Sequence, residues 1–507
     1  MRSPHCVVAL DAGIGGGRSV VCDTSGRILS MAYREWTYHS TPSVPASYEF
    51  DAEQFWADLC TTTRDALKRG DIPADAVRAV SATGQREGIV LVGADGRELY
   101  AGPALDARGS EENRALARAY GDRIYHITGH RLNMLHAPGR LLWLQRHRPD
   151  ILAATRHLLT IDAWLCYRLS GEAAAEPSSA CSSLLFDLRR RVWSVDICGL
   201  LELDADILPK VAAAGRVIGG LTRAAAAGLG LRPGTPVVLG GGDAQCGLIG
   251  LGAVVPGDAA AIAGTTTPML LTIDQPCLDE QGRTWTRCHS IPGLWAVEAN
   301  AGVTGLRYRW LRDLLWPYPE RPDLPSGAYE AMDSAAAAVP PGAHGLRVYL
   351  GAYPMDGRRH HFMPAEGAIV GVPTGQSAAS TRAAIARAAL ESAAFAMRYN
   401  WDLMQAVTGL CPSTLYVGGG QARSALWCRI VADVLGVPLM VGAASDVTAR
   451  GAALCALAGV GEANDLAGAS RELARHTPVV PHPADHERYA EAYRRWLADL
   501  PGRHDTP

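Results

Sequence analysis

The chain has 507 residues, of which 48% are hydrophobic and 20% charged, so it is long enough for two or three folded domains and unlike a disordered protein in composition. Its 48 Lys and Arg residues nearly balance 51 Asp and Glu residues, for a net charge of −3 without a basic block, which argues against a nucleic-acid partner. Lys68 and Lys210 are the only lysines, so the Gly-Lys-Ser/Thr turn of a P-loop cannot be built.

Targeting and redox signals are weak along the whole chain. No apolar stretch reaches the ~20 residues that a membrane span needs, and residues 1–10 are too short and polar for a secretory leader. The 12 cysteines contain no Cys-x-x-Cys pair and several lie in apolar runs, as buried thiols do. We therefore expect a cytoplasmic protein without a membrane segment that acts on a small ligand or a protein.

The first half of the chain predicts layers of strands and helices. Residues 6–23 form an apolar run, a glycine turn and a second apolar run, and with residues 28–33 they predict a three-stranded meander. An amphipathic helix follows at about 51–69, with Phe55, Leu59 and Leu67 on its inner face. Further along we expect a strand at 77–82, helices near 111–120, 140–146 and 162–169, a strand at 236–239 and a helix after 243. This alternation indicates an α/β fold.

The second half repeats this plan. Residues 259–274 again read as a hairpin with a small-residue turn. We expect helices near 304–315, 377–407, 422–435 and 447–458, and strands at 414–417 and 438–441. We place the boundary near 254–257, giving domains 1–254 and 255–507 with a ligand cleft between them. Two hairpins could also match by coincidence, so the pattern alone leaves duplication open.

A glycine-rich turn joins the first two predicted strands, in the sequence Asp11-Ala12-Gly13-Ile14-Gly15-Gly16-Gly17. Backbone N–H groups in such a turn can bind an anion, so Gly13 is a candidate phosphate contact. The chain continues as a strand where a dinucleotide fingerprint opens a helix, so a Rossmann fold is disfavoured. Asp11 ends a buried strand, where a carboxylate needs a cation or donors. A purely structural glycine turn is the alternative.

Three later segments share this strand-then-glycine form. Gly264, Thr265 and Thr266 form the equivalent turn of the second half, and Gly418-Gly419-Gly420-Gln421 ends a strand directly before a helix. Together they predict a second phosphate turn and a flat glycine surface for a nucleotide base. Gly240-Gly241-Gly242-Asp243 places a carboxylate at a helix start, where Asp243 is either an N-cap or a base that accepts a hydroxyl proton.

Polar side chains at two further strand ends suit a polyhydroxylated ligand. Gln85-Arg86-Glu87 follows the strand at 77–82, and Asp106-Ala107-Arg108 follows a short extended segment. Their donors and acceptors can pair with several hydroxyl groups. An ion pair of Arg86 with Asp106 or Glu87 at the surface is the structural alternative.

In order and spacing, these motifs resemble the FGGY carbohydrate kinases from about residue 7 to residue 460. The Asp11 and Gly264 turns resemble the two phosphate motifs of the family, and Gly241-Gly242-Asp243 the segment with its catalytic base. Further matches are the sugar-binding segments at 85–87 and 106–108, the helix signature at 140–144, the second signature at 367–391, and the adenosine side at 418–424, including Gly419, Gly420, Gln421 and Ser424, and at 449–453.

The resemblance implies two actin-like, ribonuclease H-like domains that close on ATP, Mg²⁺ and a sugar. Within the family the motifs resemble autoinducer-2 kinases first and xylulokinases next. Two positions depart from the usual patterns. Ile14 stands where the first phosphate turn has Thr or Ser, and Ala244 stands where glycerol kinases have an amide after the base.

The function expected from the sequence is an ATP-dependent kinase for the primary hydroxyl of a small open-chain sugar, ketopentose or polyol. Asp243 acts as the base, Asp11 and Asp243 hold Mg²⁺, and substrate is bound by Gln85, Arg86, Glu87, Asp106 and Asp243. An actin-like ATPase that acts as a sensor or scaffold is the alternative. The sequence does not determine the oligomeric state; a homodimer is the assembly considered, because soluble enzymes of this size often form symmetric dimers.

Overall fold

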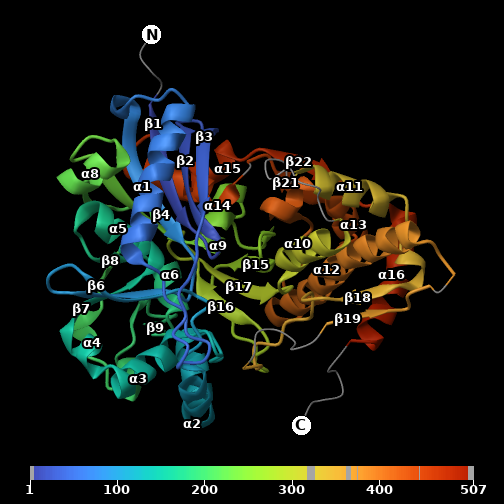
Figure 1. The fold of residues 1–507 in the computed structure, drawn as a ribbon, viewed down its shortest axis with the longest axis horizontal. Helices are drawn as coiled ribbons and strands as arrows, with labels where there is room; N and C mark the ends of the chain where they lie inside the picture. The colour runs from blue at the N-terminus through green and yellow to red at the C-terminus, as the bar shows by residue number, and fades with distance from the viewer. Residues whose placement is uncertain (1–4, 317–325, 361–366, 374, 445, 501–507) are drawn as a thin grey trace.

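The computed structural model describes residues 5–316, 326–360, 367–373, 375–444 and 446–500. Two α/β bodies lie side by side, the first half of the chain in blue to green and most of the second in yellow to red (Figure 1). Each body is built around one large sheet, with six strands in the first and seven in the second. This arrangement confirms the predicted α/β fold.

The first sheet has the strand order β12-β13-β4-β1-β2-β3. Its strands are β1 (Cys6–Ala12), β2 (Gly16–Asp23), β3 (Ile28–Glu35), β4 (Val77–Gly84), β12 (Val217–Gly220) and β13 (Pro236–Gly242). β1, β2 and β3 pair antiparallel, which confirms the predicted meander, whereas β4 pairs parallel with both β1 and β13.

The second sheet has the order β16-β17-β15-β14-β20-β21-β22. Its strands are β14 (Ala259–Ile262), β15 (Pro268–Ile273), β16 (Trp285–Cys288), β17 (Trp295–Asn300), β20 (Leu415–Gly418), β21 (Leu439–Gly442) and β22 (His476–Val479). β15 pairs antiparallel with β14 on one side and β17 on the other, and β20 pairs parallel with β14 and β21. Both sheets therefore contain the same five-strand core, so the duplication is real.

The predicted helices form, most with small shifts at their ends, although the helix expected at 111–120 continues to Thr128. Helix α1 (Ala52–Arg69) buries Phe55, Leu59 and Leu67, and the Asp51 carboxylate caps it by accepting the N–H of Gln54 at 3.0 Å. The other large helices are α2 (Ser110–Thr128), α3 (Ala137–His147), α5 (Ile161–Ser170), α9 (Asp243–Leu251), α10 (Thr304–Leu315), α11 (Ser326–Ala337), α12 (Ala378–Thr408), α13 (Ala425–Leu435), α14 (Val447–Gly459) and α16 (Pro483–Ala498). Among the described residues, no helix is long and apolar enough to cross a bilayer.

Helix α14, from the second half of the chain, packs mainly on the first sheet, while its first residue, Val447, clusters with Ala260 of β14. Its Ala449 and Leu454 share one buried cluster with Val7 and Ala9 of β1 and with Ile249 of α9. The two bodies are thus joined by a common apolar core beside α9, which holds the start of that helix in place.

A part of the first body that the sequence did not predict is a small sheet of order β6-β5-β7. Its strands are β5 (Ile89–Gly93), β6 (Glu98–Gly102) and β7 (Thr155–Thr160). Because β5 follows residues 85–87 directly and β6 precedes Asp106, this sheet sets the positions of both predicted sugar-binding segments.

Candidate active site

Three parallel strands bring the predicted acidic residues to one edge of the first sheet. Ala12 of β1 lies opposite Gly84 of β4, and Gly84 lies opposite Gly242 of β13. Residues at the carboxyl ends of these strands therefore meet, as at ligand sites of many α/β sheets. Asp11, the 85–87 segment and Asp243 gather here.

Asp11 is 4% exposed, and its Oδ1 atom has no hydrogen-bond partner. Its Oδ2 lies 3.4 Å from Nε of Arg18. Burial raises the pKa of Asp11 to about 7, against the lowering effect of Arg18, and the nearby Asp446 and Asp243 add to the rise. A buried carboxylate oxygen without a donor fits a cation or an ordered water.

Arg18 on β2 is a site residue that sequence reasoning missed. Its guanidinium lies between Asp11 and Asp446, and it forms a close ion pair with Asp446, the residue that caps α14. It is also partly exposed, at 31% of its side chain. A cation directly after a glycine turn, inside an otherwise apolar strand, was the available signal.

Asp243 begins α9, and its two carboxylate oxygens have different surroundings. Oδ1 accepts the N–H of Ala244 at 2.7 Å and pairs with Nε of Arg86 at 3.2 Å. No hydrogen bond from the described residues reaches Oδ2, and 35% of the side chain is exposed. Burial raises the pKa of Asp243, and Glu87 and Glu298 raise it further against the lowering effect of Arg86. One oxygen is therefore free for a ligand.

Arg86 and Glu87 belong to a charged cluster that spans both bodies. Arg86 donates through Nη1 and Nη2 to Oε2 and Oε1 of Glu298, at 2.5 and 3.0 Å. Arg287 lies 2.8 Å from Glu298 through Nε and donates to Glu87 Oε1 at 2.7 Å. Although burial raises the pKa of Glu298, the guanidinium groups of Arg86 and Arg287 hold it below its ordinary value. A charge within each apolar strand, β16 and β17, was the only sequence signal.

Gln85 and Asp106 are buried, and their hydrogen bonds go to protein groups. Oε1 of Gln85 accepts the N–H of Ala104 at 2.9 Å. The Asp106 carboxylate accepts the Tyr48 N–H at 3.1 Å and pairs with Arg108 Nε at 2.8 Å, with a further short bond from Tyr100. In this structure they shape the wall of the site, and their direct contact with substrate stays a prediction.

Hydrogen bonds from Gln421 hold the second predicted phosphate turn, at 264–267, in place. The Gln421 amide donates to Gly264 O at 3.0 Å and to Thr304 Oγ1 at 2.8 Å, and Thr304 in turn bonds Thr267 at 2.7 Å. Thr265 is exposed and Thr266 partly exposed. Gln421 therefore supports the turn, and the two threonines are open to a ligand.

Gly419 and Gly420 form the predicted glycine surface after β20. Gly419 has φ +98°, and a Cβ there would lie 2.5 Å from the carbonyl oxygen of Ala263, so only glycine fits without strain. A Cβ on Gly420 would meet nothing within 4 Å, which leaves room for a flat ligand beside it. Ser424 caps α13 by accepting the N–H of Trp427 at 3.0 Å, and it bonds Asp333.

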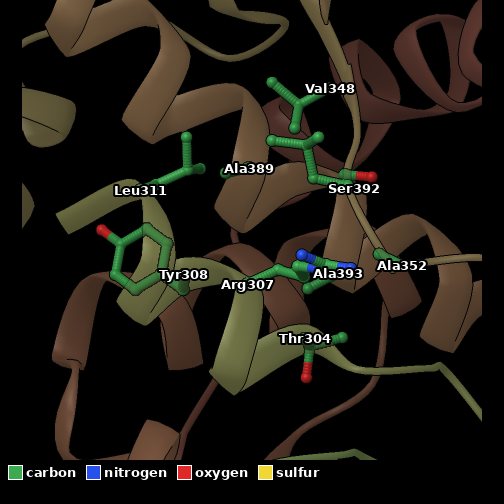
Figure 2. Close-up of a pocket in the computed structure, with 10 residues that line it drawn as sticks. Thr304, Arg307, Tyr308, Leu311, Val348, Ala352, Ala389, Ser392 and Ala393 are labelled. Atoms are coloured by element: carbon green, nitrogen blue, oxygen red, sulfur yellow. The ribbon is translucent and has the colours of Figure 1, made fainter. Parts of the chain in front are cut away.

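A small cavity lies behind the second turn, between α10, β18 (Arg347–Tyr349) and α12 (Figure 2). Arg307, Tyr308 and Leu311 line it from α10, and Ser392 lines it from α12. Thr304 is shared by this cavity and by the cluster that supports the turn. Among the described residues, those that line the cavity are distinct from the residues of the acidic site.

A repeated α/β body with a glycine turn in each half and carboxylates gathered at a sheet edge is the arrangement expected of a phosphoryl-transfer enzyme. The comparisons with known proteins agree: the model of the FGGY family of carbohydrate kinases, N-terminal domain, matches residues 6–250, and that of its C-terminal domain matches residues 259–460. The chain belongs to the FGGY family. It is a carbohydrate kinase, which transfers phosphate to an alcohol group.

The similar proteins cover nearly the whole chain. An autoinducer-2 kinase from Photorhabdus laumondii is 35% identical over 501 residues, 97% of this chain and 93% of that protein, and one from Salmonella typhimurium is 34% identical over 506 residues, 98% and 94%. The crystal structure of a xylulose kinase from Rhodospirillum rubrum has a TM-score of 0.81 at 25% identity and covers 97% of this chain and 98% of its own. A gluconate kinase from Lactobacillus acidophilus, with TM-score 0.82, 19% identity and coverage of 98% and 97%, shows the same fold.

Proposed function

We propose that this kinase phosphorylates a primary hydroxyl of a small open-chain substrate, of the autoinducer-2 or ketopentose type, with ATP as donor. The free Oδ2 of Asp243, at the partly exposed edge where three strands end, carries the proposal. The similarity to autoinducer-2 kinases over 97% of the chain supports an open-chain substrate. The similarity to a xylulose kinase structure supports a ketopentose as the second candidate substrate.

The nucleotide lies between the two glycine turns in this proposal. The turn at Gly13 and the turn at Gly264 contact its phosphates, the second through the hydroxyls of Thr265 and Thr266. The N–H groups of Gly13 and Gly264 themselves bond Gly16 O and Thr266 O, so neighbouring N–H groups of each turn would be the donors. Gly419 and Gly420 face its base, beside Ser424. Gln421 holds the phosphate turn in place through its hydrogen bond to Gly264 O.

The free Oδ1 of Asp11 fits a Mg²⁺ ion held directly or through water, with Asp243 as the second candidate carboxylate. When bound, Mg²⁺ neutralises charge on the transferring phosphate.

Asp243 acts as the general base in this account. Its Oδ2 accepts the proton of the substrate hydroxyl as that oxygen attacks the γ-phosphorus in line and the bond to ADP breaks. Arg86 holds Oδ1, so the carboxylate stays oriented during transfer. Glu87, Gln85 and Asp106 orient the other hydroxyls, directly or through the wall that they build. Closure of the two bodies excludes water, which otherwise competes as acceptor.

Asp243→Asn tests this function. The amide cannot take a proton, so we expect kcat to fall by about 10²- to 10⁴-fold while ATP binding, measured by calorimetry, changes little. Asp71→Asn is the control, because Asp71 lies on an exposed turn outside the site, and it should keep full turnover. Unchanged kcat in Asp243→Asn contradicts the base role.

The expected cytoplasmic location and homodimer remain proposals. All 12 cysteines are free and only Cys411 is exposed, which fits a reducing compartment with an ATP supply. Light scattering of the purified protein tests the dimer.

A further inference from the structure

The charged cluster beside the proposed base has members from both bodies and a defined connectivity. Arg86 contacts Asp243 through Nε and Glu298 through both Nη atoms, and Glu298 also pairs with Arg287, which binds Glu87. Arg287 lies diagonally across from Glu298 on β16 and β17, because the register pairs Trp285 with Glu298. The second body therefore reaches the base through Arg86.

Stability alone does not explain this cluster. Glu298 and Arg287 are both 0% exposed, and Arg287 also stacks over the Trp285 ring at 5.3 Å. Desolvating such charges is costly, and apolar residues of similar volume often give an equal or more stable fold. Buried charges can instead serve to fix the geometry of neighbouring groups, and Arg86 is the group that this cluster places.

The orientation of Arg86 supplies that account. An arginine fork binds one carboxylate with two parallel hydrogen bonds when it is free to do so. Here the fork is already filled by Glu298, at 2.5 and 3.0 Å, and Asp243 receives only the Nε edge at 3.2 Å. If the fork were empty, it could turn onto Asp243 and occupy both carboxylate oxygens.

We propose that Glu298 is a positioning residue of the kinase: by binding both Nη groups of Arg86, it restricts Arg86 to one ion pair with Asp243 and leaves Oδ2 free for the substrate hydroxyl. This inference rests on the proposed function of Asp243 as base. No contact of Glu298 with substrate is required, since it acts through Arg86.

Arg287 extends the same role to the substrate side. Glu87 has φ +62°, a conformation unfavourable for a residue with a side chain, so its turn must be held by contacts. Arg287 binds the Glu87 carboxylate at 2.7 Å, and Arg140 binds its backbone carbonyl. Glu298 therefore links the base and the strained substrate turn through its two arginine partners.

The test is Glu298→Gln, which keeps the side-chain shape and removes the charge. We expect kcat with the best sugar acceptor to fall by about 10- to 100-fold, as for a small misplacement of a reacting group, with KM for ATP within about 2-fold of wild type. Glu391→Gln is the matched control, because Glu391 is equally buried and pairs with Arg387 at 2.8 Å on α12. It should lower the melting temperature as much and leave kcat unchanged.

A second background separates positioning from general damage. Lysine has no fork, so in Arg86→Lys the added Glu298→Gln change should alter kcat by less than about 2-fold. The same loss in both backgrounds, or wild-type kcat in Glu298→Gln alone, overturns the inference. If Glu298→Gln does not fold, Glu298→Asp, too short to fill the fork, is measured with the same criteria. Asp243→Asn is assayed in parallel. If Asp243→Asn keeps full turnover, the base role of Asp243 is wrong. If Asp243→Asn loses turnover while Glu298→Gln keeps wild-type kcat, only the positioning role of Glu298 is wrong.

Discussion

Glu176 is a buried acid near the start of α9, the helix that carries the proposed base. It is 0% exposed, and its Oε2 accepts the N–H groups of Ser178 and Ser179 at 2.8 and 3.3 Å. Ser178 in turn accepts the N–H of Gly242 at 3.1 Å, so this acid supports the residue before Asp243. Burial raises the pKa of Glu176 to about 8, and Asp162 adds to the rise. The pKa of this carboxyl in the folded protein therefore lies above that of an exposed glutamate.

We predict that Glu176 makes the fold less stable as pH rises. Between the ordinary glutamate pKa of about 4.5 and the folded value of about 8, the folded state binds a proton that the unfolded state has released, so stability falls across this window and the loss is complete above it. Glu176→Gln stays neutral and should flatten the fall. Urea unfolding at pH 5 to 9 measures it, with exposed Glu111→Gln as control. A slope unchanged from wild type in Glu176→Gln contradicts the account.

The crossing of α9 and α14 determines where Asp243 lies. The two helices touch backbone to backbone: a Cβ on Gly451 would lie 1.8 Å from Cys246 O, and one on Gly250 would lie 1.8 Å from Val447 O. Any side chain at these glycines must push the helices apart. Because α9 begins at Asp243, such a shift also moves the base.

Gly451→Ala should therefore affect both stability and catalysis. We expect a loss of about 1–3 kcal/mol in unfolding free energy, as for other overpacked cores, and a lower kcat. Gly199→Ala, in the short helix α7 (Val195–Leu200), is the control, because a Cβ there meets nothing within 4 Å and alanine favours helix. If Gly451→Ala keeps wild-type stability and kcat, the close contact of α9 with α14 does not determine the position of Asp243, and the prediction is wrong.

Elements with local signals could be predicted from the sequence. The hairpins, the glycine turns and the amphipathic helix α1 each follow from residues close together in the chain, and the structure confirms them. The Arg86–Glu298 pair could not be predicted, because its partners are 212 residues apart and meet only when the two sheets pack. Arg18 and Asp446, 428 residues apart, were missed for the same reason.

At the scale of the whole molecule, duplication explains the site. Each sheet presents the carboxyl ends of its parallel strands with a glycine turn, and charged pairs such as Arg18 with Asp446 and Arg86 with Glu298 join the two bodies. The sequence predicted two domains from repeated motifs, but it contained no signal that α14 would pack on the first sheet. The tertiary contacts of that helix join the two bodies through a shared buried cluster.

The fate of the γ-phosphate tests the central claim most directly. Phosphorus NMR of ATP incubated with the protein and D-xylulose, D-ribulose, L-ribulose, erythritol, glycerol or the open-chain autoinducer-2 precursor distinguishes a sugar phosphate ester from inorganic phosphate. The account predicts an ester with at least one open-chain acceptor, with the strongest signal from the precursor or a ketopentose, and ester formation slower by about 10²- to 10⁴-fold with Asp243→Asn. Inorganic phosphate alone, at a rate independent of every acceptor, would contradict it and would favour an ATPase that senses or scaffolds.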